Sequence, residues 1–215
     1  MKVAVVAGTP VDTRMGVDYL KGKSGEIETV SLPMFSCPQK TSLFQMSDHD
    51  NKVAVTLARF LPLVETGIRD FFVYCNSLCA TVDYDAVAAS LGVRIITVKN
   101  AYGALAKLYD HVGVIAANNQ TTKWIEDTFI AANPGGYVCG TGFLKLVEGV
   151  ESGVVPAELV NRFCLDGLCR TYEAAGCQAV ILGCTHFPYF QKELQALTAL
   201  PVLNPADILY EELMG

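Results

Sequence analysis

Two cysteines in similar surroundings could together carry out acid–base chemistry. Cys75 follows the apolar run FFVY at 71–74, and Cys184 follows the apolar run AVILG at 179–183. A thiolate can take a proton from one face of a carbon while a thiol returns a proton to the opposite face. Two cysteines on either side of a substrate would therefore move a proton without a cofactor.

The position of each cysteine in the chain favours reactivity. In both places a short apolar run, typical of a buried parallel strand, gives way to a segment expected to begin a helix. A residue there lies at the carboxyl end of a strand, where open α/β sheets bind ligands. The positive end of a helix dipole also favours a thiolate, so the ordinary cysteine pKa of about 8.5 needs only a modest decrease. We predict that Cys75 and Cys184 are the catalytic pair.

Polar residues directly after each cysteine could hold a substrate. Asn76, Ser77 and Thr185 offer side-chain donors beside backbone N–H groups, and such donors bind a carboxylate and stabilise an enolate-like transition state. His186 could tune or relay the proton of Cys184. A histidine in such a place is often structural, so both roles stay open for His186.

The pattern of apolar runs predicts an α/β fold with parallel sheets. The expected strands of the first half span 2–7, 26–32, 71–74 and 93–98. The expected helices span 52–66, 83–91, 187–200 and 204–214. Strands that alternate with helices in this way indicate a parallel sheet covered by helices.

The pattern then restarts at a constant distance. The run HVGVIAA at 111–117 resembles KVAVVAG at 2–8, a shift of 111 − 2 = 109 residues, and Cys184 also lies 184 − 75 = 109 residues after Cys75. Two further strands have counterparts at the same distance. An unchanged offset across four strands predicts two pseudo-symmetric, Rossmann-like domains with the active site in the cleft between them.

The restart also predicts where the chain divides. We assign 1–98 and 205–215 to the first domain and 99–204 to the second. A length of 215 residues with 51% hydrophobic content is enough for two cores.

Composition argues for a small-molecule partner. The net charge is −6 and the 16 Lys and Arg residues are scattered, which argues against a nucleic-acid surface. No apolar segment approaches the roughly 18 residues of a membrane span, and the apolar run at the N-terminus is too short for a signal peptide. We therefore expect a cytoplasmic protein with reduced cysteines.

The two cysteine motifs resemble those of the aspartate/glutamate racemase family. VILGCTHFP, which contains Cys184, is similar to the second cysteine motif of the glutamate racemases, and Cys75-Asn76-Ser77 resembles the Cys-Asn-Thr motif of their first cysteine. AVVAGTPVDTRMG at 4–16 is similar to the first strand and loop of the wider family. The resemblance implies two α/β domains and two cysteines that act without pyridoxal phosphate, and it allows a homodimer. We expect no metal, because the sequence has no C-x2-C metal pair.

Some residues depart from the family pattern. Ser77 replaces the usual Thr, and the Asp-Ser-Gly of the glutamate racemases is absent after the first strand. VIAANNQTT at 114–122 loosely resembles a third binding loop of the family. The predicted catalytic residues are Cys75, Cys184 and His186, and the predicted substrate-binding residues are Thr9, Asp12, Asn76, Ser77, Asn118, Thr121 and Thr185.

The predicted function is racemisation of an acidic amino acid, glutamate or aspartate, without a cofactor. A hydantoin racemase, a maleate isomerase or an arylmalonate decarboxylase could use the same scaffold, although two cysteines favour racemisation over decarboxylation. A non-catalytic protein that closes on a small carboxylate is a further alternative. A zinc site made of Cys75, Cys79, Cys184 and His186 lacks a C-x2-C pair, and neither Cys75 nor Cys184 has the following arginine of a cysteine phosphatase.

Overall fold

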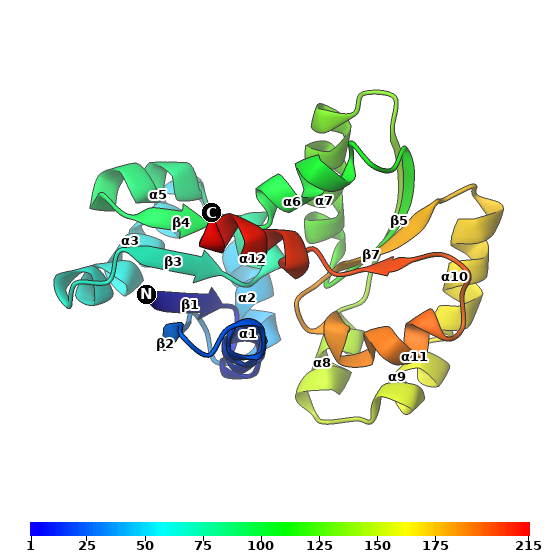
Figure 1. Ribbon diagram of the computed structural model, residues 1–215, viewed down its shortest axis with the longest axis horizontal. Helices are drawn as coiled ribbons and strands as arrows, with labels where there is room; N and C mark the ends of the chain where they lie inside the picture. The colour runs from blue at the N-terminus through cyan, green and yellow to red at the C-terminus, as the bar shows by residue number, and fades with distance from the viewer. The chain divides into compact units, whose positions relative to one another are not determined.

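The computed structural model describes residues 1–215, which form two compact units. Unit 1 comprises Met1–Val98 and Ile208–Gly215, and unit 2 comprises Lys99–Asp207. Each unit contains one four-stranded parallel sheet with helices packed on it (Figure 1). The predicted fold class, two α/β domains with parallel sheets, is confirmed.

The sheet of unit 1 has the strand order β2-β1-β3-β4. Its strands are β1 (Lys2–Ala7), β2 (Glu28–Pro33), β3 (Asp70–Val73) and β4 (Arg94–Ile96). Its helices are α1 (Pro10–Lys23), α2 (Pro38–Gln45), α3 (His49–Glu65), α4 (Asn76–Cys79) and α5 (Tyr84–Leu91). The central strand β1 is fully buried from Val3 to Ala7, as its continuous apolar sequence requires.

The last helix, α12 (Ala206–Met214), returns the chain to unit 1 from Ile208 onward. The Arg94 side chain of β4 donates hydrogen bonds to the backbone carbonyls of Glu212 and Leu213. The end of α12 is therefore tied to the edge strand of the first sheet.

The sheet of unit 2 has the order β6-β5-β7-β8, which is the same topology. Its strands are β5 (His111–Ala116), β6 (Tyr137–Gly142), β7 (Ala179–Gly183) and β8 (Val202–Leu203). Its helices are α6 (Lys99–Leu105), α7 (Asn119–Ala132), α8 (Leu144–Glu151), α9 (Pro156–Arg162), α10 (Leu165–Ala174), the 3₁₀ helix η1 (Phe187–Phe190) and α11 (Gln191–Gln195). No helix of either unit has the length and apolar character needed to cross a membrane.

The register of the two sheets repeats with the offset found in the sequence. Val3 pairs with Asp70 in the first sheet, and Val112 pairs with Ala179 in the second. Both members of the second pair lie 109 residues after those of the first, since 112 − 3 = 109 and 179 − 70 = 109. The internal repeat is thus a repeat of strand pairing.

Local structure differs from the sequence expectation at 187–200, after β1 and beside both cysteines. The segment 187–200 is not one helix: η1 and α11 end at Gln195, whose side-chain amide donates to the Thr198 and Leu200 carbonyls and so stabilises the turn that follows. The stretch after β1 is not a loop, because Pro10 opens α1 there. Since α4 and η1 have only four residues each, the helix dipole beside either cysteine is weaker than expected.

Candidate active site

Cys75 lies at the carboxyl end of the unit 1 sheet, directly against β1. It is the N-cap residue of α4 and is buried. A methyl group on the Cα of Gly8 would lie 3.5 Å from the Cys75 sulfur and 3.0 Å from the Thr41 hydroxyl oxygen. Glycine at position 8 therefore leaves room for a sulfur and a hydroxyl at the end of β1. We call the residues that meet here, Gly8, Thr9, Asp12, Thr41 and Cys75 to Ser77, the Cys75 site.

Two predicted binding residues belong to the first turn of α1. The Thr9 hydroxyl caps the helix by accepting a hydrogen bond from the Asp12 backbone at 3.2 Å. The Asp12 carboxylate is 1% exposed and accepts a hydrogen bond from the Gly8 backbone N–H at 3.3 Å. A buried carboxylate thus lies at the positive end of α1, next to the glycine that the Cys75 sulfur contacts.

Helix α2 completes this site with residues that the sequence analysis did not select. The Thr41 hydroxyl faces the Gly8 carbonyl at 3.5 Å, and the Gln45 side-chain amide donates to the Ser77 carbonyl at 3.2 Å. Asn76 and Ser77 are both buried. The first turn of α4, which carries these polar residues, is therefore bound to α2.

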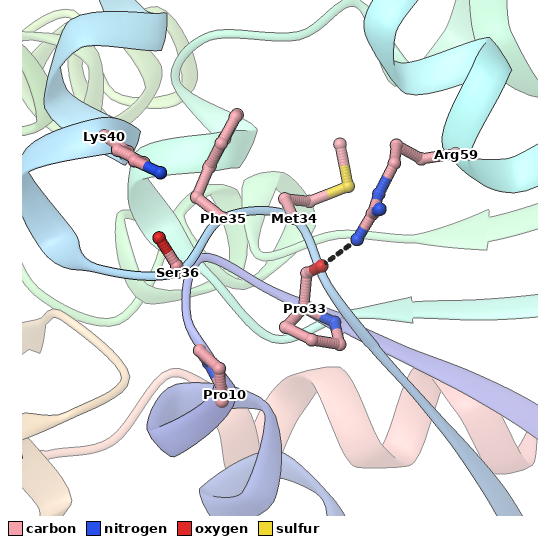
Figure 2. Close-up of a pocket in the computed structure, with 7 residues that line it drawn as sticks. All are labelled: Pro10, Pro33, Met34, Phe35, Ser36, Lys40 and Arg59. Atoms are coloured by element: carbon pink, nitrogen blue, oxygen red, sulfur yellow. Dashed lines mark hydrogen bonds between the residues drawn. The ribbon is translucent and has the colours of Figure 1, made fainter.

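A cavity of about 400 Å³ opens beside the Cys75 site, at the carboxyl ends of β1 and β2 (Figure 2). Its walls are formed by Pro10, Pro33, Met34, Phe35, Ser36, Lys40 and Arg59. The Arg59 guanidinium donates to the Pro33 carbonyl, whereas the Lys40 ammonium at the other end of the cavity forms no ion pair. The Phe35 backbone N–H donates to the Gly8 carbonyl at 2.9 Å, which joins the cavity wall to the Cys75 site.

Cys184 directly follows β7 and is supported by a chain of ionisable side chains. Its sulfur lies 3.5 Å from Nδ1 of His186, and Nε2 of His186 lies 3.0 Å from a carboxylate oxygen of Glu151. Cys184, Thr185 and His186 are buried, and the Glu151 side chain is 15% exposed. We call these four residues the Cys184 site. A carboxylate that orients a histidine toward a thiol is an arrangement that activates a nucleophile or base.

Glu151 was missed by the sequence analysis. It is the last residue of α8, at the negative end of the helix dipole, where an acidic side chain is unfavourable unless another group stabilises it. The ion-pairing geometry with His186 provides that stabilisation. An acidic residue in the last turn of an amphipathic helix was thus the feature of the sequence that could have identified Glu151 as a site residue.

Asn118 and Thr121 lie at the start of α7, equivalent to the Thr9 and Asp12 positions of unit 1. The Asn118 side chain accepts hydrogen bonds from the Thr121 backbone N–H at 2.9 Å and from the Thr121 hydroxyl at 3.0 Å. These contacts give both residues a capping role at the carboxyl end of β5. Whether they also touch a substrate stays a prediction.

The chain matches a known family along most of its length. Residues 26–213 match the family described as Asp/Glu/Hydantoin racemase. The chain belongs to this family. No group of three His, Cys, Asp or Glu side chains is arranged to hold a metal ion.

Proteins with similar sequences include glutamate racemases. The chain is 27% identical to a glutamate racemase of Lysinibacillus sphaericus over 151 residues, which are 67% of this chain and 56% of that relative. It is 26% identical to a glutamate racemase of Limosilactobacillus reuteri over 146 residues, 66% of this chain and 53% of the relative. The matched part thus spans only about half of each of these relatives.

Solved structures share the fold along the whole chain. A glutamate racemase from Francisella tularensis, in complex with D-glutamate, superposes with a TM-score of 0.76 at 18% identity, covering 99% of this chain and 79% of that one. An aspartate racemase homologue from Pyrococcus horikoshii superposes with a TM-score of 0.72 at 17% identity, covering 99% and 97%. At these identities, the likeness establishes the two-domain fold.

Proposed function

We propose that the protein is an amino-acid racemase that acts on glutamate or aspartate, with Cys75 and Cys184 as its two acid–base groups. The observation that carries this proposal is the equivalence of the two sulfurs. Each follows the third strand along the chain in a sheet of the same order, and each is buried among polar side chains. Family membership supports racemisation, and the family description includes hydantoin racemases beside those of aspartate and glutamate.

In the proposed reaction a thiolate on one side of the substrate takes the α proton. The electrons of the broken C–H bond move into the α-carboxylate, which becomes enolate-like, and the thiol on the other side then donates its proton to the opposite face. The first cysteine ends as a thiol and the second as a thiolate, so proton and charge balance. The reverse direction exchanges the two roles.

The remaining residues of the two sites have distinct proposed roles. Asn76, Ser77 and Thr185 hold the α-carboxylate, because their side chains and backbone N–H groups supply several donors to one anion. His186, oriented by Glu151, is the proposed relay for the proton of Cys184.

The cavity beside the Cys75 site is the proposed place of the distal carboxylate. Lys40 lines it and has no carboxylate partner of its own, and Ser36 adds a hydroxyl. A substrate carboxylate would complete a charge-assisted hydrogen bond to Lys40. This assignment favours an acidic amino acid over a neutral one.

Circular dichroism tests the proposed function. The purified protein is incubated with the L and D forms of glutamate, aspartate, glutamine, asparagine and alanine, with no pyridoxal phosphate. We expect the signal of one acidic amino acid to decay to zero from either enantiomer. In D₂O the same substrate should gain α-deuterium. Binding of an acidic amino acid without deuterium incorporation would instead support a non-catalytic binding protein.

A further inference from the structure

The hydroxyl of Thr41 is turned away from the helix that carries it. A threonine inside a helix can donate its hydroxyl to the carbonyl four residues earlier. Five helical threonines of this chain do so at 2.7 to 3.1 Å: Thr13, Thr56, Thr122, Thr128 and Thr171. The Thr41 hydroxyl of α2 instead faces the carbonyl of Gly8, 33 residues earlier, at 3.5 Å.

This contact is weak, and the Gly8 carbonyl does not depend on it. Hydrogen bonds between a hydroxyl and an oxygen usually measure about 2.5 to 3.0 Å, so the contact is at the outer limit. The same carbonyl accepts a hydrogen bond from the Phe35 backbone N–H at 2.9 Å. Thr41 is 6% exposed, so its hydroxyl is buried without a strong partner. Such a hydroxyl is available to a ligand.

The Thr41 hydroxyl and the Cys75 sulfur lie against the same side of Gly8. A methyl group on the Gly8 Cα would be 3.0 Å from the hydroxyl oxygen and 3.5 Å from the sulfur. Carboxylate oxygens are only about 2.4 Å from the carbon that carries the carboxylate, and a hydrogen bond adds about 2.7 Å. A carbon in contact with the sulfur can therefore place its carboxylate at the Thr41 hydroxyl.

The first turn of α2 is suited to an anion. It contains Lys40 and no acidic residue, and no side chain caps this end of the helix. A cation there faces the positive end of the helix dipole, which is unfavourable unless a negative charge is nearby. Lys40 also lines the cavity beside the Cys75 site (Figure 2). Thr41 thus follows a residue whose position favours a bound carboxylate.

We propose that Thr41 is a substrate-binding residue, and that its hydroxyl donates a hydrogen bond to the α-carboxylate while the α carbon lies against Cys75. The proposal deepens the proposed function and rests on it, because the α-carboxylate becomes enolate-like in that reaction. A donor at this carboxylate stabilises the charge that develops there. The weak contact with Gly8 is then exchanged for a charge-assisted hydrogen bond, which is stronger.

Two alkylating reagents that differ in one group test this proposal on the full chain. Iodoacetate has a carboxylate on the carbon that the sulfur attacks, whereas iodoacetamide has a neutral amide there. Mass spectrometry gives the rate at which each reagent modifies Cys75, in wild type and in Thr41→Val. A charged acceptor gains about twice as much from a donor as a neutral one, so the ratio of the iodoacetate rate to the iodoacetamide rate should fall roughly 5-fold. The same ratio for Cys184 should stay where it is.

The ratio separates recognition of a carboxylate from packing. A change in the packing or in the thiolate fraction of Cys75 alters both rates alike and cancels. Thr41→Ser keeps a hydroxyl and should keep the wild-type ratio. Thr56→Val is the matched control and should also keep it, since Thr56 is a buried threonine of unit 1 that donates to its own helix at 2.8 Å. Thr41→Ala also lacks the hydroxyl and replaces Thr41→Val if that variant does not fold.

The outcomes separate the role of Thr41 from the proposed function. An unchanged Cys75 ratio without the Thr41 hydroxyl, or an equal fall in Thr41→Ser or Thr56→Val, would overturn the proposal. A Cys75 that neither reagent modifies in wild type would also overturn it, because a carboxylate could then not reach the sulfur. Alkylation needs no turnover, so failure to racemise any amino acid would reject the proposed function, and the ratio would still decide the role of Thr41.

Discussion

Cys75 and Cys184 follow equivalent strands of two sheets with the same order, yet the side chains around them differ in kind. Beside Cys184, His186 and Glu151 form a continuous line of ionisable groups. Around Cys75 lie the buried Asp12 carboxylate and the α2 residue Thr41, and the cavity beside this site is lined by the Lys40 ammonium.

The difference teaches that a repeated backbone does not require repeated chemistry. The register of strand pairing repeats, while the helices that reach each strand end bring different residues: α2 in unit 1 and α8 in unit 2. In the proposed mechanism unit 2 supplies a proton relay and unit 1 selects the substrate. Four predictions test this division.

The largest effect should come from the cysteines themselves. Serine is a far weaker acid than cysteine, so Cys75→Ser and Cys184→Ser should each lower racemisation by roughly 10²- to 10⁴-fold. With a leaving group on the β carbon, elimination needs only one proton abstraction. Each variant should therefore retain elimination for one enantiomer, and the two variants for opposite ones. Loss of both enantiomers in one variant, with the other variant unaffected, would show a one-base enzyme.

Removal of the Glu151 charge should have the next largest effect. Glu151→Gln keeps the shape but loses the charge-assisted bond to His186, so racemisation should fall roughly 10- to 100-fold. Elimination should fall only for the enantiomer that Cys184 deprotonates. Glu158→Gln, which breaks the exposed pair with Arg162, is the control and should leave both rates unchanged. Equal losses for both enantiomers would contradict a relay confined to unit 2.

The selectivity assigned to unit 1 depends on Lys40. Lys40→Gln should raise KM for the acidic substrate by about 10-fold and change kcat less, because one charge-assisted contact at an exposed position is lost. Lys21→Gln, on the last turn of α1, is the matched control. A change in kcat with unchanged KM would show that Lys40 acts on the chemistry and not on binding.

The smallest effect is a loss of stability at alkaline pH, and it comes from the Cys79 thiol next to the Cys75 site. The unfolded chain loses the Cys79 proton near pH 9, whereas burial in the folded protein raises the pKa of this thiol to about 12. The unfolded state therefore binds fewer protons above pH 9, and the unfolding free energy should fall by about 1 kcal/mol between pH 9 and pH 10.

Urea unfolding at a series of pH values measures this slope. Cys79→Ala should have a flatter decline than wild type over the same interval, even if its stability at pH 7 is lower. Cys164→Ala, at an exposed position, should keep the wild-type slope. A wild-type slope in Cys79→Ala would show that other groups account for the alkaline decline.

Sequence patterns were most informative about the sheets. The 109-residue offset between the apolar runs matches the strand order and the register of both units, because strand pairing depends on short apolar segments that are readable in the chain. The same runs also indicated that Cys75 and Cys184 stand at the ends of strands.

Residues contributed by helices were harder to predict. Thr41, Lys40 and Glu151 lie far in sequence from the cysteines, and only the packing of α2 and α8 brings them to the strand ends. The short lengths of α4 and η1 also escaped prediction, since helix ends depend on contacts such as those of Gln195.

The return of α12 to unit 1 has a consequence for how the protein is made. Unit 1 is discontinuous in the chain, so the ribosome must synthesise all of Lys99–Asp207 before the residues that bind Arg94 emerge. At typical translation rates this delay is on the order of ten seconds. During that time the edge strand of the first sheet, β4, lacks the hydrogen bonds that its Arg94 side chain donates to α12. The nascent first half is thus expected to need protection from aggregation until the last helix docks.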